Sequence, residues 1–165
     1  MDAAQYVQHT RQRLLADGNE VSDVVLRGGA VLIGYQSQFK MRWMATKLHL
    51  FTGVAAVPQA TAQAVAALSA EAIGYAKATK GQLRGLQTGV AAIPALVADE
   101  VTPDGRAAAE ARPAKEFAAI VLPAVVDLRA GQVYSYTGTI VIGAVYAGFL
   151  RERVRTIFPA PPPNP

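Results

Sequence analysis

A glycine pair between two runs of β-branched residues constrains the fold more than any other feature of this sequence. Val21 to Arg27 and Ala30 to Gln36 are each of strand length, and Gly28-Gly29 lies between them. Glycine adopts the positive φ angles of a two-residue hairpin turn at no steric cost. The sequence therefore predicts an antiparallel hairpin near the N-terminus, and with it a sheet.

Three segments show the apolar periodicity of helices. Asp2 to Ala16 begins with a residue that can cap the first amide groups and is followed by the stop signal Asp17-Gly18-Asn19. Pro58 to Thr79 begins with a residue that suits a first helical turn. Thr139 to Phe158 has the clearest apolar face. We expect a helix over each of these three segments.

Two further strands are expected between these helices. Phe39 to Val57 favours one long, bent strand, because a bulge near Trp43-Met44 would bring its apolar residues to the same side. Val90 to Val97 is an apolar run of strand length. Proline cannot donate to a sheet ladder, so Pro94 predicts that this strand is an edge or carries a bulge.

A second hairpin completes the expected sheet. Phe117 to Leu128 and Gln132 to Tyr136 flank the turn residues Ala130-Gly131. Helices and strands are partly segregated along the chain, which is typical of α+β proteins. We expect a single α+β domain over residues 1–158, with a mostly antiparallel or mixed sheet of five to six strands covered by about three helices. Residues 159–165 are rich in proline and predict an extended tail.

The composition bears on the partners of the chain. Its 165 residues suffice for one domain with a sizeable core. Hydrophobic residues make up 52% and charged residues 17%, whereas soluble domains average roughly 45–50% and 25%. This excess favours a homo-oligomer. No apolar run is long enough to span a bilayer, and no secretory signal is visible, so we expect a cytoplasmic protein rather than a membrane protein. An interfacial helix stays compatible with the sequence.

The reactive side chains are few. The chain has no cysteine, which excludes disulfides, iron–sulfur clusters and thiolate zinc sites, and its only histidines are His9 and His49. No serine lies in the Gly-x-Ser-x-Gly context of a hydrolase. The sequence predicts no catalytic, cofactor-binding or metal-binding residue, and it favours a protein that is not an enzyme.

One segment, from Gln38 to Phe51, is both basic and apolar. Its candidate partner-binding residues are Lys40, Arg42, Trp43, Lys47 and His49, with Phe39 beside them. Aromatic stacking platforms with cations for phosphates suit single-stranded nucleic acid. An aromatic anchor with an arginine also suits a protein interface. The third interpretation is a core strand whose basic side faces water.

Lys80, Arg84 and Arg153 are further candidates for partner binding. Lys80 and Arg84 lie among glycines in residues 77–89, where backbone amides can approach an anion. A P-loop leaves a strand and enters a helix, whereas this loop leaves a helix and enters a strand. That order favours an ordinary helix C-terminus with its basic residues. Arg153 falls within the apolar face of the last helix, where it must pair or snorkel, and is a candidate interface residue.

Asp23 and Gln38-Phe39-Lys40 resemble the motif of the PD-(D/E)xK nucleases, in which two acids hold a metal and a lysine orients water. The resemblance covers about the first half of the chain. Gln38 replaces the acidic ligand, Ser22 replaces the proline, and Asp23 comes one strand too early. A neutral amide is a poor ligand for Mg²⁺ beside a carboxylate. The resemblance implies at most a degenerate, nuclease-like binding module.

Three functions follow from these patterns. The first is a non-enzymatic domain that oligomerises or binds another protein, since apolar residues are in excess and catalytic motifs are missing. The alternative is a basic nucleic-acid-binding module, because the net charge is +4. The second alternative is a small-ligand-binding protein or enzyme with a pocket between the sheet and the last helix, near Tyr134, Tyr136 and Tyr146.

Overall fold

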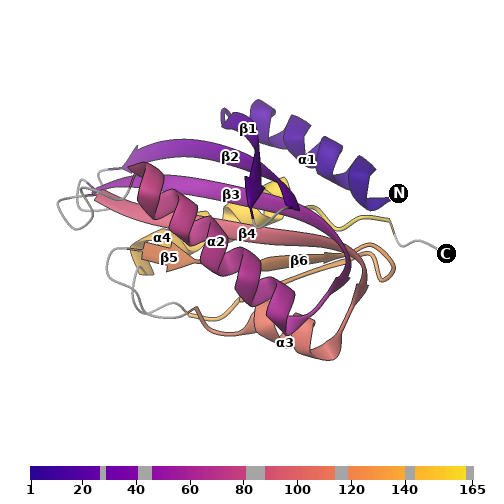
Figure 1. The fold of residues 1–165 in the computed structure, drawn as a ribbon. Helices are drawn as coiled ribbons and strands as arrows, with labels where there is room; N and C mark the ends of the chain where they lie inside the picture. Colours follow the sequence, from indigo (N-terminus) through magenta and orange to yellow (C-terminus); the bar gives the residue numbers. More distant parts are fainter. Residues whose placement is uncertain (27–28, 41–45, 81–87, 114–118, 140–143, 163–165) are drawn as a thin grey trace.

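The computed structural model describes residues 1–26, 29–40, 46–80, 88–113, 119–139 and 144–162 (Figure 1). Within these ranges the elements are α1 (Ala3–Ala16), β1 (Glu20–Leu26), β2 (Gly29–Lys40), β3 (Thr46–Ala60), α2 (Ala62–Lys80), β4 (Thr88–Val101), α3 (Pro103–Glu110), β5 (Ala119–Val121), β6 (Ala124–Asp127), β7 (Gln132–Ser135) and α4 (Ala144–Ile157). None of the described helices combines the length and hydropathy of a bilayer-spanning segment.

The strands form one mixed sheet in the order β1-β2-β3-β4-β6-β7, with β5 beside β4. Antiparallel pairs join β1 to β2, β2 to β3 and β6 to β7, whereas β4 runs parallel to β3, β5 and β6. The expected α+β fold with a mixed sheet covered by helices is confirmed. Over the described residues it has seven strands and four helices, rather than five to six strands and about three helices.

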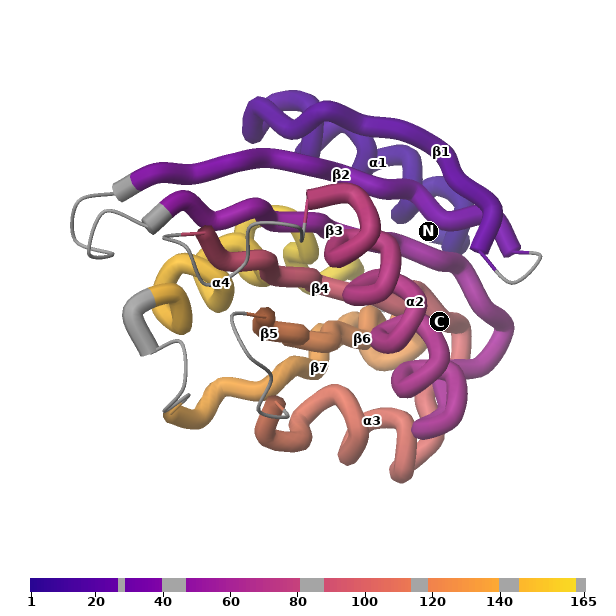
Figure 2. Tube along the Cα trace, turned by 60° about the vertical axis from the view of Figure 1, so that its left-hand side comes forward, coloured from indigo at the N-terminus to yellow at the C-terminus, as the bar shows by residue number. Residues whose placement is uncertain are grey.

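Helices cover both faces of the sheet. Figure 2 shows α2 on the near side and both α1 and α4 on the far side. Leu32, Leu48 and Leu50 point to the side of α1 and α4, where they join a core that includes Phe149. Alternate residues such as Ile33 and Phe51 point to the side of α2. Because both faces are buried, the central strands are apolar at nearly every position.

The first helix and the first hairpin follow the sequence. Asp2 caps α1 in a capping box with Gln5, and Gly18 ends the helix with a φ of 80°. β1 and β2 pair from Glu20 opposite Tyr35 to Leu26 opposite Gly29. Both predictions are confirmed.

The prediction of one long, bent strand over Phe39 to Val57 is wrong. β2 ends at Lys40, and β3 begins at Thr46 and runs antiparallel to it, with these two residues paired. The expected bulge at Trp43-Met44 lies outside the described residues. Alternation in sequence shows a change of face but not whether the chain continues or reverses, so a hairpin was mistaken for a bend.

The two prolines of this region were also misplaced. Pro58 does not start a helix but lies within β3, between Val57 opposite Ala98 and Gln59 opposite Glu100, and the register is the same on either side of it. The helix begins four residues later, and the Thr61 hydroxyl accepts a hydrogen bond of 3.2 Å from the amide of Ala64.

Pro94 lies in a central strand, so the expected edge is wrong. β4 is flanked by β3 on one side and by β5 and β6 on the other. The Ala92 carbonyl accepts a hydrogen bond from the amide of Leu122, which lies between β5 and β6. In a parallel ladder, every second residue of a strand forms its hydrogen bonds with the same neighbouring strand, so Pro94 faces the same side as Ala92. The ring nitrogen of Pro94 therefore faces the break between β5 and β6, where no ladder donor is needed.

The C-terminal part confirms the second hairpin with one change. β6 and β7 pair antiparallel, Gly131 takes a φ of 65°, and the Asp127 carboxylate accepts from the amide of Ala130. The expected first strand is divided into β5 and β6. The final helix is confirmed as α4, and beyond it the Pro159 carbonyl accepts a hydrogen bond of 2.8 Å from the Tyr6 hydroxyl.

Candidate functional site: an open face of the sheet

Among the described residues, β2 and β3 extend beyond the end of α2, and no described helix covers this part of the sheet face. We name as the open sheet face the side chains Tyr35, Ser37, Phe39, Lys47 and His49, with Lys80 at the end of α2. Phe39 is 57% exposed, and among the described residues it shares this exposure of a large apolar side chain with Leu15 and Val25. Ser37, Lys47 and Lys80 are also exposed, whereas Tyr35 and His49 are half-buried.

Strand register places these side chains in cross-strand pairs. Phe39 lies opposite Lys47, and Ser37 lies opposite His49. Side chains directly opposite on one face of an antiparallel pair have Cβ atoms roughly 5 Å apart. An exposed aromatic ring and an exposed cation are therefore neighbours on this face.

Tyr35 and His49 form a hydrogen-bonded, stacked pair. The Tyr35 hydroxyl lies 2.8 Å from His49 Nδ1, and the two rings are within 11° of parallel at a centroid distance of 6.0 Å. Tyr35 also contacts Phe51 at 4.9 Å, and Phe51 meets Tyr75 of α2 edge to face at 5.9 Å. These contacts anchor the half-exposed pair on the buried ring of Phe51 and, through it, on the partly buried ring of Tyr75.

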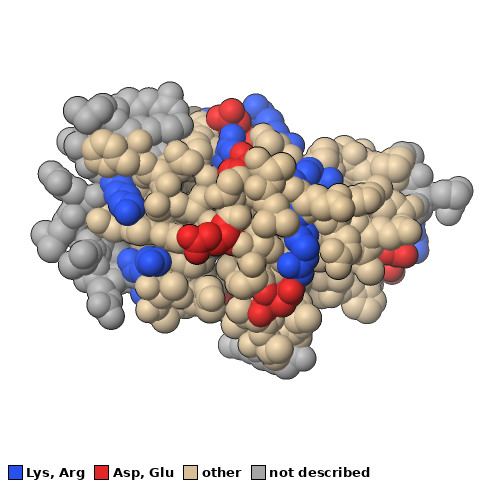
Figure 3. Space-filling model, turned by 90° about the horizontal axis from the view of Figure 1, so that it is seen from above, with Lys and Arg blue, Asp and Glu red and all other residues tan. Residues whose placement is uncertain are grey.

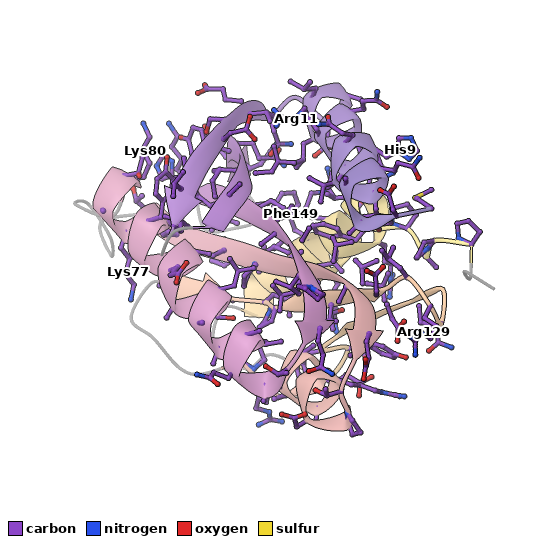
Figure 4. All side chains as sticks on the ribbon, turned by 45° about the vertical axis from the view of Figure 1, so that its right-hand side comes forward. His9, Arg11, Lys77, Lys80, Arg129 and Phe149 are labelled. Carbon is purple, nitrogen blue, oxygen red and sulfur yellow. The ribbon has the colours of Figure 1, made fainter. Side chains whose placement is uncertain are left out.

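Lys80 brings the end of α2 to the open sheet face. Its Nζ atom lies 5.4 Å from the centre of the Tyr35 ring, within the range of a cation–π contact. Figure 4 shows Lys77 and Lys80 together at this end of the helix, and Arg129 at the opposite end of the molecule. The helix terminus thus supplies positive charge beside the aromatic rings.

The surroundings of His49 disfavour its charged form. Burial lowers the pKa of His49 below its ordinary value of 6.5, and the charges of Lys47 and Lys80 lower the pKa further. His49 is therefore neutral at pH 7. Both lysines act electrostatically on this one ring, so the positive charge of the face is concentrated around it.

A hollow of about 500 Å³ adjoins the open sheet face between β1 and α2. Tyr35, Phe51 and Tyr75 form its aromatic part. Polar side chains from both flanking elements complete the lining: Glu20, Ser22, Ser37, Thr79 and Lys80. An acid on β1 and a base on α2 thus border the same hollow.

The structure brings together three of the residues selected from the sequence, Lys47, His49 and Lys80. Lys40 ends β2 next to Phe39 in the chain. The side chain of Lys40, like Arg42, Trp43 and Arg84, lies outside what the structure describes. Tyr35, Tyr75 and Glu20 were missed. Tyr35, Ser37 and Phe39 follow the period of two of a strand, and this signal would have placed Tyr35 on the same face.

Arg153 lies elsewhere. It pairs with Asp17 at the end of α1, and its guanidinium lies 5.4 Å from the ring of Phe149. The Asp17 carboxylate also accepts a hydrogen bond of 3.1 Å from the side-chain amide of Gln36. In this chain Arg153 therefore joins α4 to α1 and β2.

The nuclease-like residues are not assembled. Asp23 pairs in register with Leu32 and forms a 2.5 Å ion pair with Arg11. Lys40 lies eight residues beyond Leu32 on the same strand, about 26 Å away at roughly 3.3 Å per residue. In the part of the chain that the structure describes, no three side chains of His, Asp or Glu gather as metal ligands.

The expected tyrosine pocket is also divided. Tyr136 and Tyr146 pack against the core on the side of α4, whereas Tyr134 packs on the opposite side of the sheet. Arg106 of α3 lies over the Tyr134 ring at 4.6 Å. The three tyrosines therefore do not line one pocket beneath α4.

No protein-family model matches the sequence, and none of the curated proteins compared with it does. Function is therefore inferred from the geometry of the open sheet face.

Proposed function

We propose that this protein binds single-stranded nucleic acid on the open sheet face. The observation that carries the proposal is the exposed Phe39 ring, directly opposite Lys47 and on the same face as the Tyr35–His49 pair. Single strands are bound by aromatic rings that stack on bases and by cations that track the backbone. The open sheet face offers both within one surface.

The charges support local binding of phosphates. The net charge is +4, and Lys47 and Lys80 both lie close enough to His49 to lower its pKa. On the face drawn in Figure 3, Lys and Arg side chains lie at several separate places with acids between them. A single-stranded nucleic acid would therefore be attracted to particular lysine and arginine side chains rather than to one broad positively charged surface.

Fluorescence anisotropy tests this function. The purified protein is titrated into a fluorescein-labelled 12-nucleotide single strand of thymidines, and separately into a labelled duplex of equal length, at low salt. Binding of the single strand is expected, with weaker binding of the duplex, because paired bases are not free to stack on the open sheet face. No binding of the single strand, or tighter binding of the duplex, would overturn the proposal.

A second candidate function is self-association through β1. Among the described strands β1 has only β2 as a neighbour, so one side of its backbone is free to pair. Val25 of this strand is 73% exposed. Light scattering after size-exclusion chromatography tests the candidate: a dimer that Val25→Lys converts to a monomer supports it, and a monomeric parent protein contradicts it.

A further inference from the structure

The hollow beside the open sheet face has the size and lining of a small-ligand site. Its volume of about 500 Å³ lies within the roughly 300–1,000 Å³ of typical ligand pockets. Glu20 and Tyr35 are paired in register on β1 and β2, and Lys80 lies over the Tyr35 ring. The half-exposed ring of Tyr35 is therefore flanked by a carboxylate on one side and an ammonium group on the other.

Glu20 is available to a ligand. Its side chain is exposed, it borders the hollow, and it forms no ion pair with any side chain that the structure describes. An ionised carboxylate has two acceptor oxygens and no donor. The partner that satisfies both oxygens at once is a flat edge with two adjacent N–H groups.

Among the nucleobases, guanine has that edge. Its N1–H and N2–H groups point the same way, so one carboxylate accepts both hydrogen bonds. Adenine and cytosine each place a bare ring nitrogen beside the amino group, and uracil or thymine flanks its single N–H with two carbonyls. A carboxylate meets an acceptor at that position in each of these bases, which costs binding energy.

The opposite wall suits the phosphate of the same nucleotide. Lys80 borders the hollow from the end of α2 and offers an ammonium group, whereas the hydroxyl of Thr79 beside it already donates to the Tyr75 carbonyl at 2.7 Å. A base that displaces the Lys80 ammonium group from the face of Tyr35 and turns its edge toward Glu20 would leave that ammonium group free to bind the phosphate of the same nucleotide. Both walls then bind one nucleotide.

We propose that this hollow binds a guanine nucleotide, with Glu20 as the residue that selects the base. For a guanine that is part of a single-stranded nucleic acid, the inference rests on the proposed function. A free guanine mononucleotide has the same chemistry, so the experiment includes both sources.

Anisotropy with three labelled decamers tests the selection. Each decamer is a run of thymidines with one central G, A or C, and an all-thymidine strand is the reference. One good bidentate base contact contributes about 1–3 kcal/mol, or roughly 5- to 150-fold in affinity. The G-containing strand is expected to bind at least about 5-fold more tightly than the others. Calorimetry with guanosine and adenosine monophosphates examines the free ligand.

Glu20→Gln provides the decisive variant, and Glu100→Gln its matched control. Glu100 is an exposed acid near the far end of β4, paired with Gln59. Glu20→Gln should abolish the preference for G, measured for each variant as the ratio of its affinities for the G-containing and all-thymidine strands, whereas Glu100→Gln should preserve that ratio. Circular dichroism checks that both variants remain folded.

The outcomes separate the two proposals. Thymidine binding without a preference for G, or a preference that survives Glu20→Gln, overturns the guanine site alone. Absence of all binding overturns both proposals. Glu20-dependent binding of guanosine monophosphate without binding of any strand supports the guanine site with a free nucleotide and overturns the single-strand function.

Discussion

Tyr35 and His49 lie side by side on neighbouring strands, with the tyrosine hydroxyl 2.8 Å from His49 Nδ1 and the rings nearly parallel. The pair rests on Phe51, which in turn contacts Tyr75 of α2. A surface of half-exposed rings is thereby fixed to the core. Such rigidity lowers the entropic cost of ligand binding, because the side chains are already ordered.

Stability should fall as the pH is lowered through the titration of His49. Its folded-state pKa lies below 6.5, so between that pKa and 6.5 the unfolded chain binds more protons than the folded chain. The stability contributed by neutral His49 is therefore complete above pH 6.5 and is lost as the pH falls toward the folded-state pKa.

Thermal unfolding at pH 7.5 and pH 5.5 checks this dependence. Between pH 7.5 and pH 5.5, the Tm of the parent protein should fall by more than the Tm of the His49→Gln variant. His9→Gln is the matched control, because His9 is exposed on α1, and its loss should equal that of the parent. Equal losses in the parent and His49→Gln would contradict the prediction.

Removal of the Phe39 ring should weaken single-strand binding without unfolding the protein. Stacking contributes about 1–3 kcal/mol per base, so Phe39→Ala should raise Kd roughly 5- to 150-fold. Because the ring is 57% exposed, the free energy of unfolding should change by less than about 0.5 kcal/mol. Val25→Ala, at another exposed apolar residue on β1, should leave Kd unchanged. An unaltered Kd in Phe39→Ala would count against the stacking role.

Gly105 should tolerate no side chain. A Cβ atom there would lie 2.1 Å from the Ala60 carbonyl oxygen, which also accepts hydrogen bonds from the amide and hydroxyl of Thr102. Gly105→Ala must move α3 away from the end of β3, at an expected cost of about 2–3 kcal/mol. Gly74→Ala on α2 meets nothing within 4 Å and should stabilise by about 0.5–1 kcal/mol. Urea unfolding measures both, and equal effects would contradict this packing.

The sequence allowed the prediction of local features whose cause lies within a few residues. Asp2 with Gln5 caps α1, and Gly18 and Gly131 take positive φ where chain reversals were expected. These conformations depend on hydrogen bonds and steric freedom within one turn. Tertiary packing has little influence on them.

The remaining features depend on contacts between distant elements. The reversal within Gln38 to Phe51 is set by the pairing of β2 with β3, and Pro94 is tolerated because the neighbouring strand is interrupted beside it. The open sheet face depends on where α2 ends over the sheet. Lys80 is 45 residues from Tyr35 in the chain, and no local pattern places its ammonium group over that ring.

The salt dependence of binding tests the central claim most directly. For single strands, each phosphate contact contributes about 0.7 to the slope of log K against log salt concentration. The double variant Lys47→Gln/Lys80→Gln should reduce the magnitude of this slope by about 1.4. Arg129→Gln removes a positive charge at the opposite end of the molecule and should preserve the parent slope. A double variant whose slope equals that of the parent would contradict nucleic-acid binding on the open sheet face.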